Sequence, residues 1–235
     1  MSSMAASEPI SRAMETTPNA NRTSRLSIIA GLSGIIFVVL LVGPLFAFGL
    51  GPSPTSGPGD VAGYYAQNAG VLQTIQVLRA SSTLFFLVFL AGLSERIRRL
   101  TRFTALSAGV VAAGVTVAGI DVVLYAARQA IALNAAQIQD PAVVQTIRDF
   151  SNALETFSSM PLAVLVVLTS WALVALRGAG RWIGWAGVAV ALLLLLAGVS
   201  PTSAFLKPIG VVAFLFASIW LAVLAVWLSM QRSAA

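Results

Sequence analysis

Six long apolar stretches, separated by short polar connectors, dominate this chain. They cover about residues 26–50, 71–93, 104–130, 158–177, 183–199 and 208–230. A membrane-spanning helix needs roughly 20 mainly apolar residues, and a bilayer accepts only structures that satisfy their own backbone hydrogen bonds. The pattern therefore predicts an all-α fold, a single polytopic helix bundle over residues 26–230 with six transmembrane helices.

The segments before and between these stretches predict shorter elements. Residues 1–25 are polar and lack an apolar period, which is typical of a disordered tail, and residues 231–235 form a second short tail. The connector 51–59 is rich in proline and glycine, which do not continue a helix. Asp60 after it has the character of an N-cap, so we expect a short helix to begin there.

A second amphipathic segment is predicted ahead of the fourth stretch. Asp140 followed by Pro141 has the residue types of an N-cap and a first helical position. Apolar residues then recur at helical spacing, namely Val144, Ile147, Phe150, Leu154 and Phe157. We expect this helix to lie at the outer surface, with its apolar stripe over the mouth of the bundle, and Pro161 to interrupt it before it enters the membrane.

Composition agrees with a membrane protein and narrows its chemistry. Hydrophobic residues make up 58% of the chain and charged residues 9%, against about 25% charged in soluble proteins. The sequence contains no cysteine and no histidine, which excludes disulfides, thiol chemistry, histidine acid–base catalysis and the commonest metal ligand. It therefore predicts no cofactor and no metal.

Basic residues beside the stretches predict the orientation, because cytoplasmic loops of membrane proteins retain Lys and Arg. Arg128, Arg148 and Lys207 fall on one side, and Arg79 lies within a stretch. Ten fall on the other side: Arg12, Arg22, Arg25, Arg96, Arg98, Arg99, Arg102, Arg177, Arg181 and Arg232. The asymmetry predicts a multi-pass protein of the cytoplasmic (inner) membrane with both termini in the cytoplasm.

The net charge of +6 does not point to nucleic acid, since the arginines flank apolar stretches and do not form one basic face. The run Arg96, Arg98, Arg99 and Arg102 is mainly a topology anchor. The same four side chains are also candidates for binding anionic lipid headgroups.

Arg79 and Asp121 are the charged residues deepest within the apolar stretches. Each costs about 2.5 to 3.5 kcal/mol at a helix centre, so such residues normally face the bundle and find partners. Counted from the ends of their stretches, both lie roughly 12 Å below the outer surface. Equal depth predicts an ion pair, with Gln76 and Tyr125 as additional hydrogen-bond partners.

Two further charged residues extend this group. Arg128 shares a helical face with Asp121 and Tyr125, and Glu155 lies on the segment leading into the fourth stretch. The candidate polar intramembrane cluster is thus Gln76, Arg79, Asp121, Tyr125, Arg128 and Glu155. One interpretation is a structural network that fixes helix rotation and register, and the other is an outward-facing cavity that binds a small solute or relays a cation.

Several segments also resemble a known group of proteins. They are Asp-Val-Ala-Gly-Tyr-Tyr at 60–65, Phe-Phe-Leu-Val-Phe-Leu at 85–90 leading to Arg96, Arg98 and Arg99, and Arg177 followed by Arg-Trp-Ile-Gly-Trp at 181–185. These features are similar to those of the small multi-span integral membrane proteins of unknown function that are common in actinobacteria. The resemblance implies six helices in the cytoplasmic membrane and carries over no activity and no site residues.

Three classes of function are compatible with the sequence. A non-enzymatic structural, accessory or interaction component accounts for every feature by insertion and packing. The alternative is a small-solute or cation carrier or channel with a polar cavity around Arg79, Asp121 and Glu155. An intramembrane enzyme fits least, because a serine protease would need histidine, and Gly119-Ile120-Asp121 lacks the second glycine and the partner aspartate of an intramembrane aspartyl protease.

Overall fold

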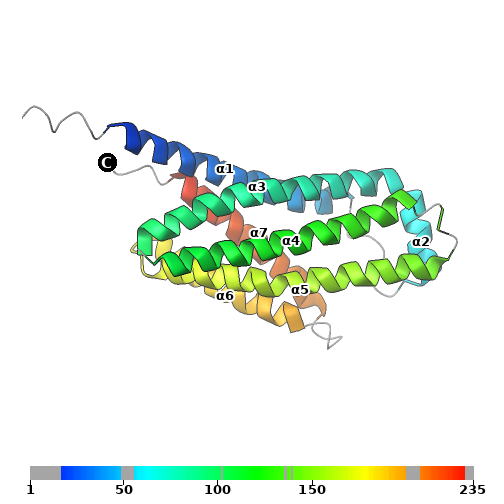
Figure 1. The fold of residues 1–235 in the computed structure, drawn as a ribbon. Helices are drawn as coiled ribbons and strands as arrows, with labels where there is room; N and C mark the ends of the chain where they lie inside the picture. The colour runs from blue at the N-terminus through cyan, green and yellow to red at the C-terminus, as the bar shows by residue number, and fades with distance from the viewer. Residues whose placement is uncertain are drawn as a thin grey trace, which may run out of the picture.

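The computed structural model describes residues 17–48, 56–101, 103–134, 137, 138, 140–199 and 207–230. Over these residues the chain forms seven α-helices (Figure 1). Their bounds are α1 (Thr17–Phe48), α2 (Pro58–Gln67), α3 (Ala69–Thr101), α4 (Thr104–Asn134), α5 (Pro141–Val174), α6 (Ala179–Val199) and α7 (Lys207–Met230). The all-α architecture predicted from the apolar stretches is confirmed.

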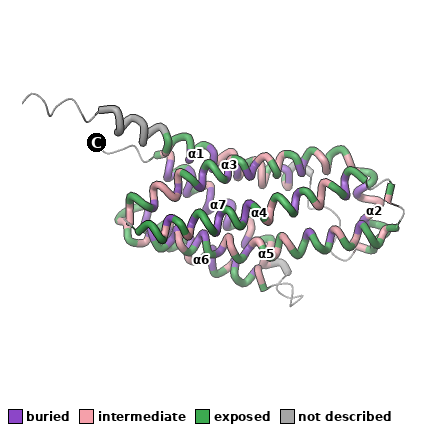
Figure 2. Tube along the Cα trace, viewed as in Figure 1, coloured by how far each residue is buried: buried purple, intermediate pink, exposed green. Residues whose placement is uncertain are grey.

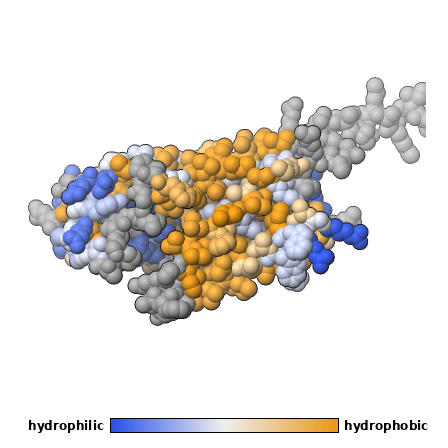
Figure 3. All heavy atoms as spheres, turned by 180° about the vertical axis from the view of Figure 1, so that it is seen from behind, coloured by the Kyte–Doolittle hydropathy of each residue, from blue (hydrophilic) through white to orange (hydrophobic). Residues whose placement is uncertain are grey.

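Six of these helices are long and apolar enough to cross a membrane, and α2 is the short exception. Their side chains form an apolar band between two polar ends, as Figure 3 shows. Such a band matches the hydrocarbon layer of a bilayer, which is about 30 Å thick. The protein is thus an integral, multi-pass membrane protein with a helical bundle.

The six long helices form a closed ring, in which each packs mainly against two neighbours. The order around the ring is α1, α3, α4, α5, α6 and α7, with α7 returning to α1. Buried and exposed positions alternate along each long helix in Figure 2, as expected when one helical face turns inward. The buried apolar side chains join into one hydrophobic core, whose largest members include Phe86, Phe89, Leu165, Leu173 and Leu224.

Small residues allow close approach between neighbouring helices. A Cβ atom added to Gly184 of α6 would lie 2.7 Å from the backbone nitrogen of Val174 and 3.0 Å from the carbonyl oxygen of Ser170, both on α5. Trp220 of α7 donates its indole N–H to the carbonyl oxygen of Ile183 over 2.9 Å. Close backbone contact and interhelical hydrogen bonds drive helix association in lipid, where burial of apolar surface contributes little.

Three helices continue past the ring at the end that carries α2. The α3, α4 and α5 helices have 33, 31 and 34 residues, whereas α6 has 21. At 1.5 Å per residue, α5 is about 50 Å long and α6 about 32 Å. The α2 helix lies across the extended ends (Figure 1), and Val61, Tyr65, Ile131 and Val144 form a second small core there. We call this the α2 end.

The opposite end of the ring carries Arg98, Arg99, Arg177 and Arg181, and we call it the basic end. The α1 helix begins at this end and α7 finishes there (Figure 1). The grouping of basic residues at one end agrees with the connector pattern of the sequence.

Several local expectations need correction. The α1 helix begins at Thr17, so residues 17–25 are helical where a disordered tail was expected, and residues 1–16 lie outside the described part. The N-cap of α2 is Gly57, and Asp60 lies inside the first turn, because Pro58 already supplies a favourable first helical position. Asp140 is an N-cap as predicted, and its carboxylate accepts the backbone N–H of Ala142 at 2.9 Å.

The α5 helix differs from expectation in two ways. It is continuous through Pro161, so the expected interruption is absent. Helices packed on both sides tolerate the one backbone hydrogen bond that proline removes, and α5 packs along α4 and α6. The prediction of an inward-facing apolar stripe on this helix is also partly wrong, since Val144 is buried but Phe150 and Phe157 are exposed.

Candidate functional site

The α3, α4 and α5 helices bring the six predicted cluster residues to the same part of the molecule, where the ring meets the α2 end. Their register follows from direct contacts. Gln73 of α3 donates to the carbonyl oxygen of Ala132 on α4 at 3.2 Å, and a Cβ added to Gly114 of α4 would touch Leu90 of α3 and Leu165 of α5. Since neighbouring helices in this group are antiparallel, these contacts fix which residues share a level.

The register places the cluster in three layers. Arg79, Tyr125 and Glu155 share the middle layer. Gln76 and Arg128 lie one turn closer to α2, and Asp121 lies one turn deeper into the ring. Arg79 and Asp121 therefore do not have the equal depth that was predicted from the ends of the apolar stretches.

Arg128 and Glu155 form the ion pair of this cluster. The Nη2 atom of Arg128 donates to Oε2 of Glu155 at 2.5 Å and to Oδ1 of Asn152 at 3.3 Å. The Arg128 side chain is 13% exposed and that of Glu155 is 54% exposed. The pair thus joins α4 to α5 with a charge-assisted hydrogen bond at the rim of the ring.

The direct ion pair expected between Arg79 and Asp121 is not formed. Among the described residues, no hydrogen bond or ion pair of 4.0 Å or less joins their side chains, although Arg79 lies within electrostatic range of Tyr125, Arg128, Glu155 and Asp121. The Nε atom of Arg79 and the Oε1 atom of Gln76 are buried and have no hydrogen-bond partner in the part of the chain that the structure describes. The register agrees with this outcome, because Tyr125 is level with Arg79 and Asp121 lies one turn deeper.

The α2 helix adds a residue that sequence reasoning did not assign to the cluster. Tyr65 is buried in the second core, within electrostatic range of Arg128 and Arg148. Burial raises the pKa of its hydroxyl, while the two positive charges act in the opposite direction.

Arg148 was expected only as a topology residue, yet it is buried on the same face of α5 as Val144 and Ser151. Their spacing of four and three residues is the signal that identifies this inward face.

The charges of the cluster balance. The two arginines, Arg79 and Arg128, are matched by two acidic residues, Asp121 and Glu155. Within the described residues, no group of three or more acidic side chains is arranged to hold a metal ion. The cluster can fix helix register through Arg128 and Glu155, and its unpartnered polar atoms can bind water or a small polar solute.

Three of the four basic residues predicted as candidates for lipid binding are described at the basic end, and each has a contact within the protein. Arg98 and Arg99 both pair with Glu95, at 2.7 Å each. Arg96 lies over the ring of Trp227, 5.9 Å from its centroid. Arg102 lies outside the described residues. Binding of anionic lipid headgroups by these arginines stays a prediction.

Comparison of this chain with models of protein families, with curated proteins and with solved structures finds no match. The resemblance to small actinobacterial membrane proteins accordingly stays a prediction.

Proposed function

We propose that this protein is a non-enzymatic component of the cytoplasmic membrane, with both termini in the cytoplasm, that acts through contacts with other membrane components. The single observation that carries the proposal is the continuous hydrophobic core that joins all six long helices. A carrier or channel needs polar or charged groups along a path or at a midplane site. A core built of apolar side chains therefore supports a role without transport.

The charged residues support the same proposal by their distribution. Between Arg79 and Glu95 of α3 there is no charged residue, and α4 has none before Asp121. The part of α5 from Thr156 to Val174 and the part of α6 from Trp182 onward also lack charges. The half of the ring toward the basic end is held together by apolar side chains such as Leu173, which suits a static scaffold.

The orientation is proposed on the asymmetry of the basic residues. Arg98, Arg99, Arg177 and Arg181 all lie at the basic end, which the retention of Lys and Arg in cytoplasmic loops assigns to the cytoplasm. The α2 end, with its extended α3, α4 and α5 helices, then faces outward and offers the larger surface to partners outside the bilayer.

One specific observation favours the alternative, a small-solute or cation carrier with an outward-facing cavity. Gln76 and Arg79 each keep a buried polar atom without a hydrogen-bond partner. Buried polar groups normally have partners, and a bound solute or water would supply them. Asp121 lies one turn deeper and provides a negative charge for a cation.

Reconstitution into liposomes separates the two functions. Under a K⁺, Na⁺ or proton gradient, we expect uptake by liposomes containing the protein to equal that of protein-free liposomes. An added ionophore confirms that the gradient is intact. Gradient-driven uptake by the wild-type protein that is lost in both Arg79→Gln and Asp121→Asn would contradict the proposal and establish the carrier.

A further inference from the structure

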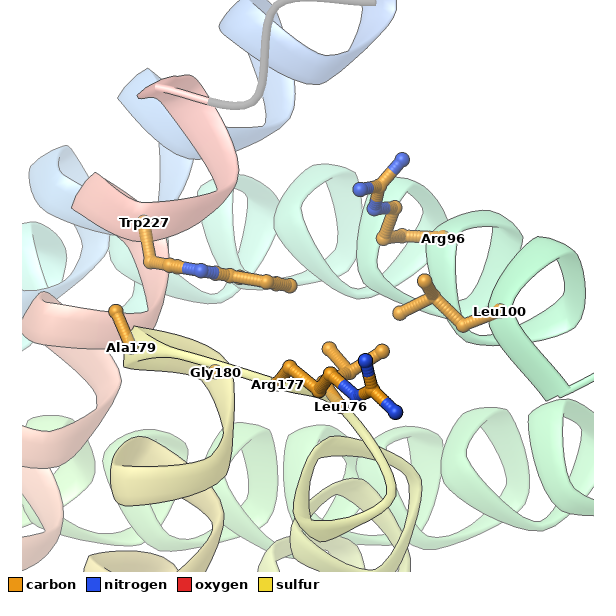
Figure 4. A pocket seen from close by; sticks show the side chains of 7 residues that line it. All are labelled: Arg96, Leu100, Leu176, Arg177, Ala179, Gly180 and Trp227. Atoms are coloured by element: carbon orange, nitrogen blue, oxygen red, sulfur yellow. The ribbon is translucent and has the colours of Figure 1, made fainter. Parts of the chain in front are cut away.

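A cavity opens at the basic end of the ring, far from the polar cluster. Its volume is about 230 Å³, and seven residues from four elements line it (Figure 4). They are Arg96 and Leu100 of α3, Leu176 and Arg177 after α5, Ala179 and Gly180 of α6, and Trp227 of α7. The Trp227 ring reaches from α7 toward the space between the two arginines.

The lining has the chemistry of an anion site. Two of the seven residues carry a guanidinium group, and none carries a negative charge. Glu95, the nearby carboxylate on α3, is already engaged by Arg98 and Arg99. Guanidinium groups bind phosphate with paired, charge-assisted hydrogen bonds. The first residues of α6, Ala179 and Gly180, also line the cavity, and the N-terminus of a helix favours negative charge.

Two glycines shape the chain beside the cavity. Gly178 has a φ angle of 71°, which residues with a side chain rarely adopt, and it makes the tight turn that places Arg177 beside the start of α6. A Cβ added to Gly180 would lie 2.9 Å from Cδ1 of Leu176 and 3.5 Å from Cζ2 of Trp227. A larger side chain at position 180 would therefore fill part of the cavity.

The volume of the cavity and its level relative to the membrane limit which ligands fit it. Pockets that enclose drug-sized molecules have volumes of roughly 300 to 1,000 Å³, so a volume of about 230 Å³ suits a single phosphate-sized group. Trp182 and Trp185 on α6, close to the cavity in sequence, are both exposed. Exposed tryptophans are typical of the headgroup level of a membrane, which places the cavity where lipid phosphates lie.

We propose that the cavity between Arg96, Arg177, Gly180 and Trp227 binds a phosphate group at the basic end of the bundle. An anionic lipid headgroup and free phosphate share a net negative charge, whereas the choline group of phosphatidylcholine offsets the charge of its phosphate. Arg96 and Arg177 supply the charge, Trp227 holds the Arg96 guanidinium in place through its ring, and Gly180 leaves room for the phosphate. Of the four arginines that the sequence suggests for anionic lipid, Arg96 lines this site.

Native mass spectrometry of the purified full-length chain tests this proposal. Phosphatidylglycerol, phosphatidylcholine and inorganic phosphate are added separately to the detergent-solubilised protein. We expect phosphatidylglycerol adducts on the wild-type protein, and about tenfold weaker binding in Arg177→Gln, since one charge-assisted contact is lost. Arg181→Gln removes a charge of the same kind outside the cavity lining and should bind like wild type.

A second variant tests the cavity itself. Gly180→Leu keeps every charge and should weaken phosphatidylglycerol binding by a similar factor, with circular dichroism confirming that the helices remain. If inorganic phosphate binds and phosphatidylglycerol does not, the site takes a soluble anion and the headgroup is excluded as the source. Equal binding of phosphatidylglycerol and phosphatidylcholine, or equal losses in Arg177→Gln and Arg181→Gln, would overturn the proposal.

Discussion

At the scale of single residues, the charges that meet are those whose side chains reach across adjacent helices. Arg128 of α4 and Glu155 of α5 lie in neighbouring layers and share a charge-assisted hydrogen bond. Arg79 and Asp121 lie one turn apart in depth and form no direct pair. The Arg128 side chain is mostly buried, which makes its contact with Glu155 stronger than an exposed salt bridge, while the exposed carboxylate of Glu155 limits the gain.

A double-mutant cycle measures this difference. We expect Arg128→Gln and Glu155→Gln to show a coupling free energy of about 1 kcal/mol, because each single change already removes the contact. Arg79→Gln and Asp121→Asn should be nearly additive, with coupling within about 0.5 kcal/mol. Thermal unfolding of the four single and two double variants in detergent measures the loss of stability in each. Strong coupling of Arg79 with Asp121 and none of Arg128 with Glu155 would show that the register is wrong.

At the scale of helices, close approach makes some glycines irreplaceable. The backbone of α5 lies against Gly184, so a methyl group there meets the nitrogen of Val174 and the oxygen of Ser170, neither of which can rotate away. We predict that Gly184→Ala lowers stability by about 1 to 3 kcal/mol, the usual cost of overpacking. Thermal melts in detergent measure the loss.

Gly119 provides the matched control for this prediction. It lies in the middle of α4, is exposed, and has no atom within 4 Å of an added Cβ. Gly119→Ala should therefore be neutral or slightly stabilising, because alanine favours the helix by up to about 1 kcal/mol. Equal effects at positions 119 and 184 would show that α5 and α6 are not in close backbone contact.

The sequence predicts the helices themselves better than it predicts how they pack and which of their residues share a level. Apolar run length and the Asp140 cap depend on neighbouring residues, so the six membrane helices and the start of α5 were predictable. The depth of Arg79 was counted from the end of an apolar run. That count fails because α3, α4 and α5 continue past the ring, so the end of the run does not mark the level of its neighbours.

The same limit explains the stripe on α5. The spacing of Phe150 and Phe157 identifies a helical face, yet periodicity alone does not say which face turns inward. The inward face instead carries Val144, Arg148 and Ser151, of which two are polar. The position of α2 over the second core decides this, and that position depends on contacts between residues far apart in the chain.

At the scale of the whole molecule, the two ends of the ring differ in charge and in shape. The basic end carries the phosphate-sized cavity and Arg177, and the α2 end carries the extended helices with a nearly neutral cluster. The apolar band lies between them (Figure 3). A polytopic protein inserts with its more basic connectors in the cytoplasm, so this difference sets the orientation and hence which partners each end can reach.

Labelling of single cysteines tests the orientation directly, because the chain contains no cysteine of its own. Gln67 and Gln137 are exposed at the α2 end, and Arg181 is exposed at the basic end. With the basic end in the cytoplasm, Gln67→Cys and Gln137→Cys should react with a membrane-impermeant maleimide in intact cells, and Arg181→Cys should react only after permeabilisation. Arg181→Cys removes one basic residue, but Arg98, Arg99 and Arg177 keep the asymmetry and so preserve the orientation. If Arg181→Cys is labelled in intact cells and neither Gln67→Cys nor Gln137→Cys is labelled, the orientation is the reverse of the one proposed and the phosphate cavity lies outside the cell.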